Sequence, residues 1–153
     1  MVDTADVAVM IEEPPFDGFR VARYSIHDSE GVSGGQLMKF ATTKEFTVTG
    51  GRLMENAAAN EGMPFAGIAA TSKVAGDGQT TIGVYPPHCG AVFDIKCSGA
   101  ACVPVPGQPV GVSGGNVVGI ISNKTQSTLS GGFLVGTAEE IASAQETIRV
   151  RLT

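Results

Sequence analysis

Apolar and polar residues alternate in two separate runs of the chain, within residues 91–97 and residues 147–152. The apolar members are Phe93, Ile95 and Cys97 in the first run, and Ile148, Val150 and Leu152 in the second. The positions between them are charged, with Asp94 and Lys96 in one run and Arg149 and Arg151 in the other. A period of two places the apolar side chains on one face of a half-buried β-strand. Both runs therefore predict strands.

Short apolar runs elsewhere are bounded by glycine and proline, which is the pattern of strands joined by turns. Such strands are predicted over 21–26, 36–40, 44–49, 65–71, 80–85, 116–121 and 132–135. Three prolines mark 103–110 as an edge strand or a linker, because proline cannot donate to a sheet ladder. The alanine-containing stretches 54–59 and 138–144 are the places where a helical turn or short helix is predicted. Asp77-Gly78 predicts a tight turn.

About nine or ten short strands with regular turn signals predict an all-β fold, a compact β-barrel or sandwich. The predicted folded domain covers 21–153. Residues 1–20 differ from it, because they are acidic and contain Pro14-Pro15, and they predict an extended N-terminal arm. This arm is either a disordered terminus or a strap that orders against a neighbouring subunit. Its large apolar residues are Val7, Val9, Met10, Ile11, Phe16 and Phe19.

Composition narrows the class of protein. The chain has 153 residues, enough for one domain, and its 42% apolar and 16% charged residues exclude a disordered chain. The 21 glycines and 8 prolines are spread along it, as in all-β proteins. A net charge of −5 with scattered basic residues argues against a nucleic-acid surface. No apolar stretch is long enough for a membrane span, and no secretory signal is visible, so we expect folding in a cytoplasm.

Candidate chemistry is sparse. The three cysteines, Cys89, Cys97 and Cys102, fit no zinc spacing and are interpreted as free thiols. Residues 31–35 and 111–115 both read G-V-S-G-G, which matches the nucleophile elbow around Ser33 and Ser113. Each copy leads into a strand-like run rather than a helix, so a repeated turn between strands is the preferred interpretation. The adjacent carboxylates of 12–13 and 139–140 are interpreted as surface charge. We expect no enzyme activity, cofactor or metal.

Seven segments follow one another along the chain in a recognisable order: residues 35–40, 63–69, 75–84 with the Gly76-Asp77-Gly78 turn, 90–95, 105–111, 132–135 and 146–152. In this order they resemble the capsid cement (decoration) proteins of tailed bacteriophages. The resemblance covers 31–153 and rests on the order and spacing of the segments. The acidic arm departs from the shorter members of the family.

The resemblance implies a head-stabilising β-barrel protein, usually a homotrimer at three-fold positions of an icosahedral head, where it clamps neighbouring major capsid proteins. The implied location is the outer surface of the virion head, after assembly in the bacterial cytoplasm. The implied partners are other copies of the chain and the major capsid protein, with no direct nucleic acid and no membrane. We expect the six apolar residues of the arm to provide subunit or capsid contacts.

Three alternatives stay open on the sequence alone. The first is a β-domain of a phage tail or fibre, which is also commonly trimeric. The second is a small serine hydrolase that uses Ser33 or Ser113. The third is a cellular β-barrel module that binds a small ligand.

Overall fold

The computed structural model describes residues 8–15, 21–40, 53–56, 65–96, 106–114, 117–120, 134–139 and 147–153. Every helix or strand element within these ranges is a β-strand, so the predicted all-β fold is confirmed. The strands are β1 (Val9–Glu12), β2 (Ala22–Ile26), β3 (Leu37–Phe40), β4 (Leu53–Asn56), β5 (Phe65–Ala69), β6 (Thr81–Tyr85), β7 (Val92–Lys96), β8 (Pro109–Gly114), β9 (Val117–Ile120), β10 (Leu134–Ala138) and β11 (Thr147–Arg151).

Five strands close into a small barrel in the order β2-β4-β3-β5-β6. Four of its five contacts are antiparallel, and the barrel closes through the parallel pair β2–β4. Inside it lies a core cluster of Ile26, Val32, Met38, Ala66, Ala69, Ile82 and Val84, all buried. Tyr24 and Phe40 pack against this cluster, and their rings meet edge to face with centroids 6.0 Å apart.

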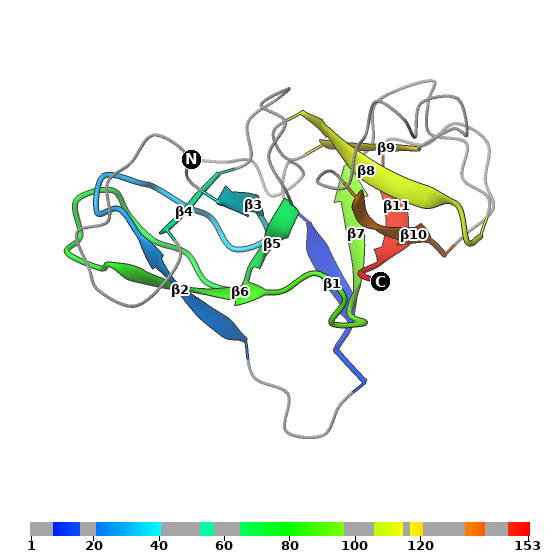
Figure 1. Ribbon diagram of the computed structural model, residues 1–153, viewed down its shortest axis with the longest axis horizontal. Helices are drawn as coiled ribbons and strands as arrows, with labels where there is room; N and C mark the ends of the chain where they lie inside the picture. Colours follow the sequence, from blue (N-terminus) through cyan, green and yellow to red (C-terminus); the bar gives the residue numbers. More distant parts are fainter. Residues whose placement is uncertain are drawn as a thin grey trace.

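The other six strands form an antiparallel sheet in the order β1-β7-β11-β10-β8-β9. Figure 1 shows this sheet beside the barrel, with β1 next to β7. The alternation predicted for the two patterned runs is confirmed in their described residues. The apolar side chains of β7 and β11 are at most 2% exposed at Phe93, Ile95, Ile148 and Val150, while Asp94 and Arg149 are half-buried.

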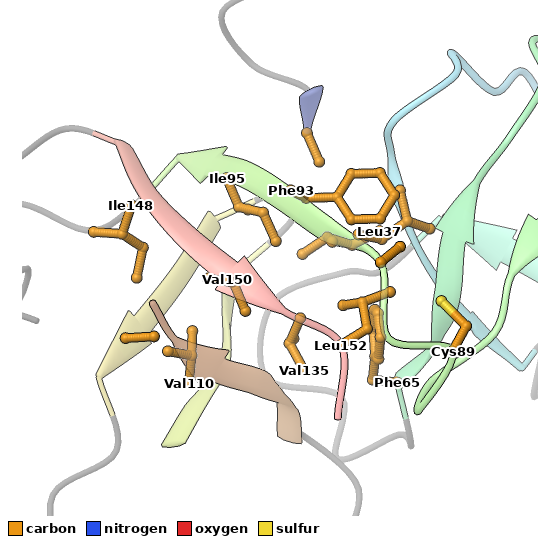
Figure 2. Packing of buried hydrophobic residues seen from close by; sticks show 14 residues of the cluster. Leu37, Phe65, Cys89, Phe93, Ile95, Val110, Val135, Ile148, Val150 and Leu152 are labelled. Carbon is orange, nitrogen blue, oxygen red and sulfur yellow. The ribbon is translucent and has the colours of Figure 1, made fainter. Parts of the chain in front are cut away.

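A larger core cluster joins the sheet to the barrel. It contains Ile148, Val150 and Leu152 from the sheet side together with Leu37, Phe65 and Ile68 from barrel strands. Figure 2 shows Leu37 next to Phe93, and Phe65 next to Leu152. Leu37 and Met38 are neighbours in β3, yet they belong to different clusters because successive side chains of a strand point to opposite faces. Strand β3 therefore contributes to both cores.

Two glycines allow close approach between strands. Gly67 in β5 has φ +134°, and a Cβ there would overlap the carbonyl oxygen of Tyr85. Gly136 in β10 lies so close to β11 that a Cβ would overlap the carbonyl oxygen of Arg151. One glycine thus permits a barrel contact and the other a contact within the open sheet.

The structure corrects two predictions. Residues 54–56, for which a helical turn was expected, belong to strand β4, because Met54 pairs with both Ile26 and Phe40. Pro109 does not lie on an edge strand or a linker: it is the first residue of β8, which pairs with β10 on one side and β9 on the other. The first position of a strand tolerates proline. The strand expected over 44–49 and residues 57–59, 103–105 and 140–144 lie outside the described residues.

Candidate functional site

Strand β1 carries the predicted contact residues that the structure describes. Val9 is 53% exposed and Ile11 is 45% exposed, whereas Met10 between them packs against the larger core. The preceding Ala8 is buried, and its N–H donates to the carbonyl oxygen of Gly35 at 2.9 Å, which connects β1 to the barrel. The contact candidates are therefore divided between surface and core. Val7, Phe16 and Phe19 lie outside the described residues.

A β-bulge sets which side chains of β1 face outward. Met10 pairs with Phe93 and Glu12 pairs with Val92. Ile11 is therefore the extra residue of the bulge and has no partner of its own on β7. Strict alternation would turn Glu12 toward the core after an inward-facing Met10. The bulge lets Glu12 face outward instead, in the same row as Val92 and Arg151. We call the exposed side chains of Val9, Ile11 and Glu12 the β1 face.

An ion-pair network fixes this outward row. The guanidinium of Arg151 lies 3.4 Å from the Glu12 carboxylate and donates to Glu139 at 2.6 Å and to the carbonyl oxygen of Gly90 at 2.9 Å. The hydrogen bond to Glu139, with the charges of Glu139 and Glu12, raises the pKa of Arg151 against the opposing effect of burial. Because β7 lies between β1 and β11, the Glu12–Arg151 pair crosses Val92, which is 2% exposed.

The barrel has its own charged cluster, which we call the Lys73 cluster: Lys73, Asp28 and Asp77. The Lys73 side chain is only 1% exposed. Its ammonium group donates to the carbonyl oxygens of Asp28 (2.8 Å), Glu30 (3.1 Å) and Val74 (3.2 Å). It also lies 3.0 Å from the Asp77 carboxylate and 3.5 Å from that of Asp28. The cluster thus joins two loops that are far apart in sequence.

The two aspartates of the Lys73 cluster also order the loops around them. Asp77 accepts from the N–H groups of Val74 at 3.1 Å and Gln79 at 2.9 Å, and Asp28 accepts from Gly78 at 2.8 Å. Burial alone would raise the pKa of Asp77, but the hydrogen bonds from Gln79, Lys73 and Val74 and the charge of Lys73 outweigh it and lower the pKa. These contacts satisfy the cluster internally, which indicates a structural role.

The serine candidates are not followed by the helix that a nucleophile elbow needs. Ser33 lies in the turn before β3, and its N–H donates to the side-chain oxygen of Gln36 at 2.7 Å. Ser113 lies within β8, which pairs with the strand β9 that follows. His27 instead contacts Ser29, two residues away, with 2.7 Å between Nδ1 and Oγ. Sequence reasoning did not single out this contact, which belongs to a local turn.

Other chemical candidates are few in the described ranges. Cys89 is buried, and burial raises the pKa of its thiol, while Cys97 and Cys102 lie outside those ranges. The described residues contain no group of three or more His, Cys, Asp or Glu side chains that is arranged to hold a metal ion. They also contain no helix that is long and apolar enough to cross a membrane. No protein-family model matches the chain, and no curated protein is detectably similar to it.

Proposed function

We propose that the chain is a capsid decoration protein of a tailed bacteriophage, which assembles as a homotrimer and stabilises the icosahedral head by clamping neighbouring major capsid proteins. The observation that carries this proposal is the ordered series of segments over 31–153 that resembles the decoration family. The all-β architecture is compatible with it, since a stabilising clip needs a rigid body and association surfaces rather than catalytic groups.

The β1 face is the part of the proposed contact surface for which the structure gives support. Val9 and Ile11 are two of three large apolar side chains that are strongly exposed in the described residues; the third is Val74. Strand β1 is also an edge strand, and such edges offer unpaired backbone groups to another chain. Met10 lies on the opposite face of β1 and packs against the larger core cluster.

Repeated weak contacts are sufficient for such a role. A cyclic trimer closes by rotation, so a heterologous contact between copies does not propagate into a fibre. A trimer that binds several capsid subunits at once gains avidity from a modest single contact.

The first experiment is the mass of the purified chain by light scattering over a wide range of concentrations. A mass of three times 15.6 kDa supports the trimer. Binding to expanded, undecorated phage heads is then measured by co-sedimentation. A chain that stays monomeric and binds no head at any concentration contradicts the proposal.

Point substitutions test the β1 face more sharply than truncation. Deleting residues 1–19 removes β1 and uncovers β7 and part of the core, so lost binding would be ambiguous. The double variant Val9→Lys/Ile11→Lys changes only outward side chains and should weaken trimer formation or head binding at least tenfold. Val74→Lys is the matched control, because Val74 is 73% exposed on a barrel loop away from β1. Equal losses in both variants would refute the assignment of the β1 face.

A further inference from the structure

An open pocket of about 400 Å³ lies on the outer surface of the barrel. Its lining residues are Val21, Arg23, Thr71, Ser72, Gln79, Thr81 and Gly83. They come from β2 and the residue before it, from β6 and the loop before it, and from the bend after β5. The volume falls within the range of small-molecule sites, which is roughly 300–1,000 Å³. None of these residues belongs to the β1 face.

The hollow exists because an arginine stands opposite a glycine. Arg23 of β2 and Gly83 of β6 are directly paired in register, and neighbouring Thr81 shares the outward face of β6. Gly83 contributes no side chain to the pocket, and Val21 lies over its Cα. A Cβ at Gly83 would lie 3.0 Å from a methyl group of Val21 on the pocket wall.

A hydrogen-bonded bend forms the other side of the pocket. The Ala70 N–H donates to the carbonyl oxygen of Gly83 at 2.9 Å, which brings the residues after β5 beside β6. Ser72 Oγ accepts from the Gly34 N–H at 2.9 Å, so its hydroxyl proton remains able to donate to another group. Thr71, Thr81 and Gln79 add further exposed donors around the rim.

Among the described residues, no ion pair neutralises the positive charge of the pocket. Arg23 is the one charged residue in the lining, and it forms no ion pair with another described residue. The carboxylates of Asp28 and Asp77, on the adjoining loops, are already bound by Lys73 and backbone N–H groups. A planar guanidinium with hydroxyl and amide donors beside it matches a carboxylate, which accepts two parallel hydrogen bonds from arginine.

We propose that this pocket binds a small carboxylate ligand, held by Arg23 and oriented by the hydroxyl groups of Thr71, Ser72 and Thr81. The inference does not depend on the proposed role in the capsid. Because the chain carries a net charge of −5, long-range electrostatics oppose an anion, and recognition depends on the local contacts in the pocket.

The test is an NMR titration of the ¹⁵N-labelled full chain with N-acetylglutamate, and with N-acetylglutamine amide, in which both carboxylates are replaced by amides, as the uncharged probe of similar shape. We expect saturable shifts confined to amides around residues 21–23, 71–72 and 79–83. The uncharged probe should bind at least tenfold more weakly. Shifts scattered over the surface, absent saturation, or equal binding of the two probes would overturn the proposal.

Three variants separate the pocket from general charge. Arg23→Gln removes the guanidinium and should weaken the binding of N-acetylglutamate at least tenfold. Gly83→Ala narrows the pocket while keeping Arg23, and should weaken the binding of N-acetylglutamate severalfold. The matched control is Arg149→Gln, because Arg149 is also a strand arginine but is already paired with Asp94 at 3.1 Å. Amide spectra report whether each variant is folded. Unchanged binding in folded Arg23→Gln, or equal loss in Arg149→Gln, would refute the site.

Discussion

The closed barrel and the open sheet differ in how they treat the free edges of their strands. Both are built from short strands, but the barrel pairs every strand with two neighbours, whereas the sheet ends in the edge strands β1 and β9. Closure leaves no free edge, while an open sheet must protect its edges or use them. At β1 the protection consists of a short strand, a bulge and the charged Glu12. These devices leave the apolar Val9 and Ile11 exposed.

The two regions also hold their loops with different cations. In the barrel, Lys73 is enclosed and donates to three backbone carbonyl groups. In the sheet, Arg151 is partly exposed and bridges Glu12 and Glu139 at the surface. A buried cation is costly to remove because it leaves acceptors unsatisfied, whereas a surface pair contributes little. The barrel therefore depends on a buried cation for the order of its loops, whereas the link between β1 and β11 is a partly exposed ion pair.

The largest effect should come from closing the space at the two strand-contact glycines. Gly67→Ala and Gly136→Ala each force a Cβ into a backbone carbonyl group, so the free energy of unfolding should fall by about 4 kcal/mol or more. Urea unfolding followed by circular dichroism measures the loss. Gly76→Ala is the control: it also has positive φ, but nothing lies within 4 Å, so about 1 kcal/mol is expected. Equal losses at all three positions would contradict the packing.

The next effect tests whether the barrel and sheet unfold together. Leu37→Ala and Met38→Ala truncate adjacent, fully buried side chains that belong to different core clusters, and each should cost about 3 kcal/mol. Hydrogen exchange should differ between them. Leu37→Ala should speed exchange in β3, β7 and β11, because its cluster includes all three strands, whereas Met38→Ala should act mainly within the barrel. Identical exchange patterns would show that the two cores are one cooperative unit.

Removing the enclosed cation should have an intermediate effect. Lys73→Met keeps much of the side-chain volume but takes one donor from each of three carbonyl groups and removes the ion pairs with Asp28 and Asp77, and should cost about 2 kcal/mol. Thermal or urea unfolding at neutral pH measures it. Arg149→Met, which breaks a half-exposed pair with Asp94, is the control and should cost much less.

The same cluster predicts a pH dependence. Because the pKa of Asp77 is lowered in the folded state, the unfolded state binds more protons as pH falls. The contribution of Asp77 is therefore present above its ordinary pKa of about 3.9 and is lost as pH falls through the lower folded value. Asp77→Asn should flatten the stability curve below about pH 4. An unchanged slope there would contradict the assigned contacts.

The smallest effect belongs to the open sheet. Glu12→Gln removes one exposed partner of Arg151, which keeps Glu139 at 2.6 Å, so stability should change by no more than about 0.5 kcal/mol. Chemical unfolding checks this value, with Glu13→Gln as a neighbouring control. A loss above about 1 kcal/mol would mean that β1 is held mainly by this pair.

Sequence patterns predicted the strands whose two faces differ most. The alternation of β7 and β11 was readable because their inward side chains are almost fully buried while the charged ones between them reach the surface. β4 was mispredicted because its conformation depends on pairing with β2 and β3, which its local composition does not reveal. Local sequence signals cannot supply such long-range pairing.

The candidate surfaces were less predictable than the fold. The apolar residues of the arm were singled out from sequence, but the different orientations of Val9 and Met10 follow from the register of β1 against β7. Lys73 carries no local signal of burial: one of its carboxylate partners, Asp77, is four residues away, but the other, Asp28, is distant in the chain. The pocket at Arg23 depends on the cross-strand pairing with Gly83, which likewise cannot be predicted from the sequence around either residue.

Strand β7 imposes an order on how the molecule is completed during synthesis. Its two neighbours are β1, made early by the ribosome, and β11, made late. All barrel strands precede β7, so the barrel can close while β1 still lacks its partner. The nascent chain then carries an unsatisfied strand with apolar side chains until Val92–Lys96 has emerged. The pairing of β1 with β7 therefore forms across a long stretch of sequence, after all the barrel strands have been made.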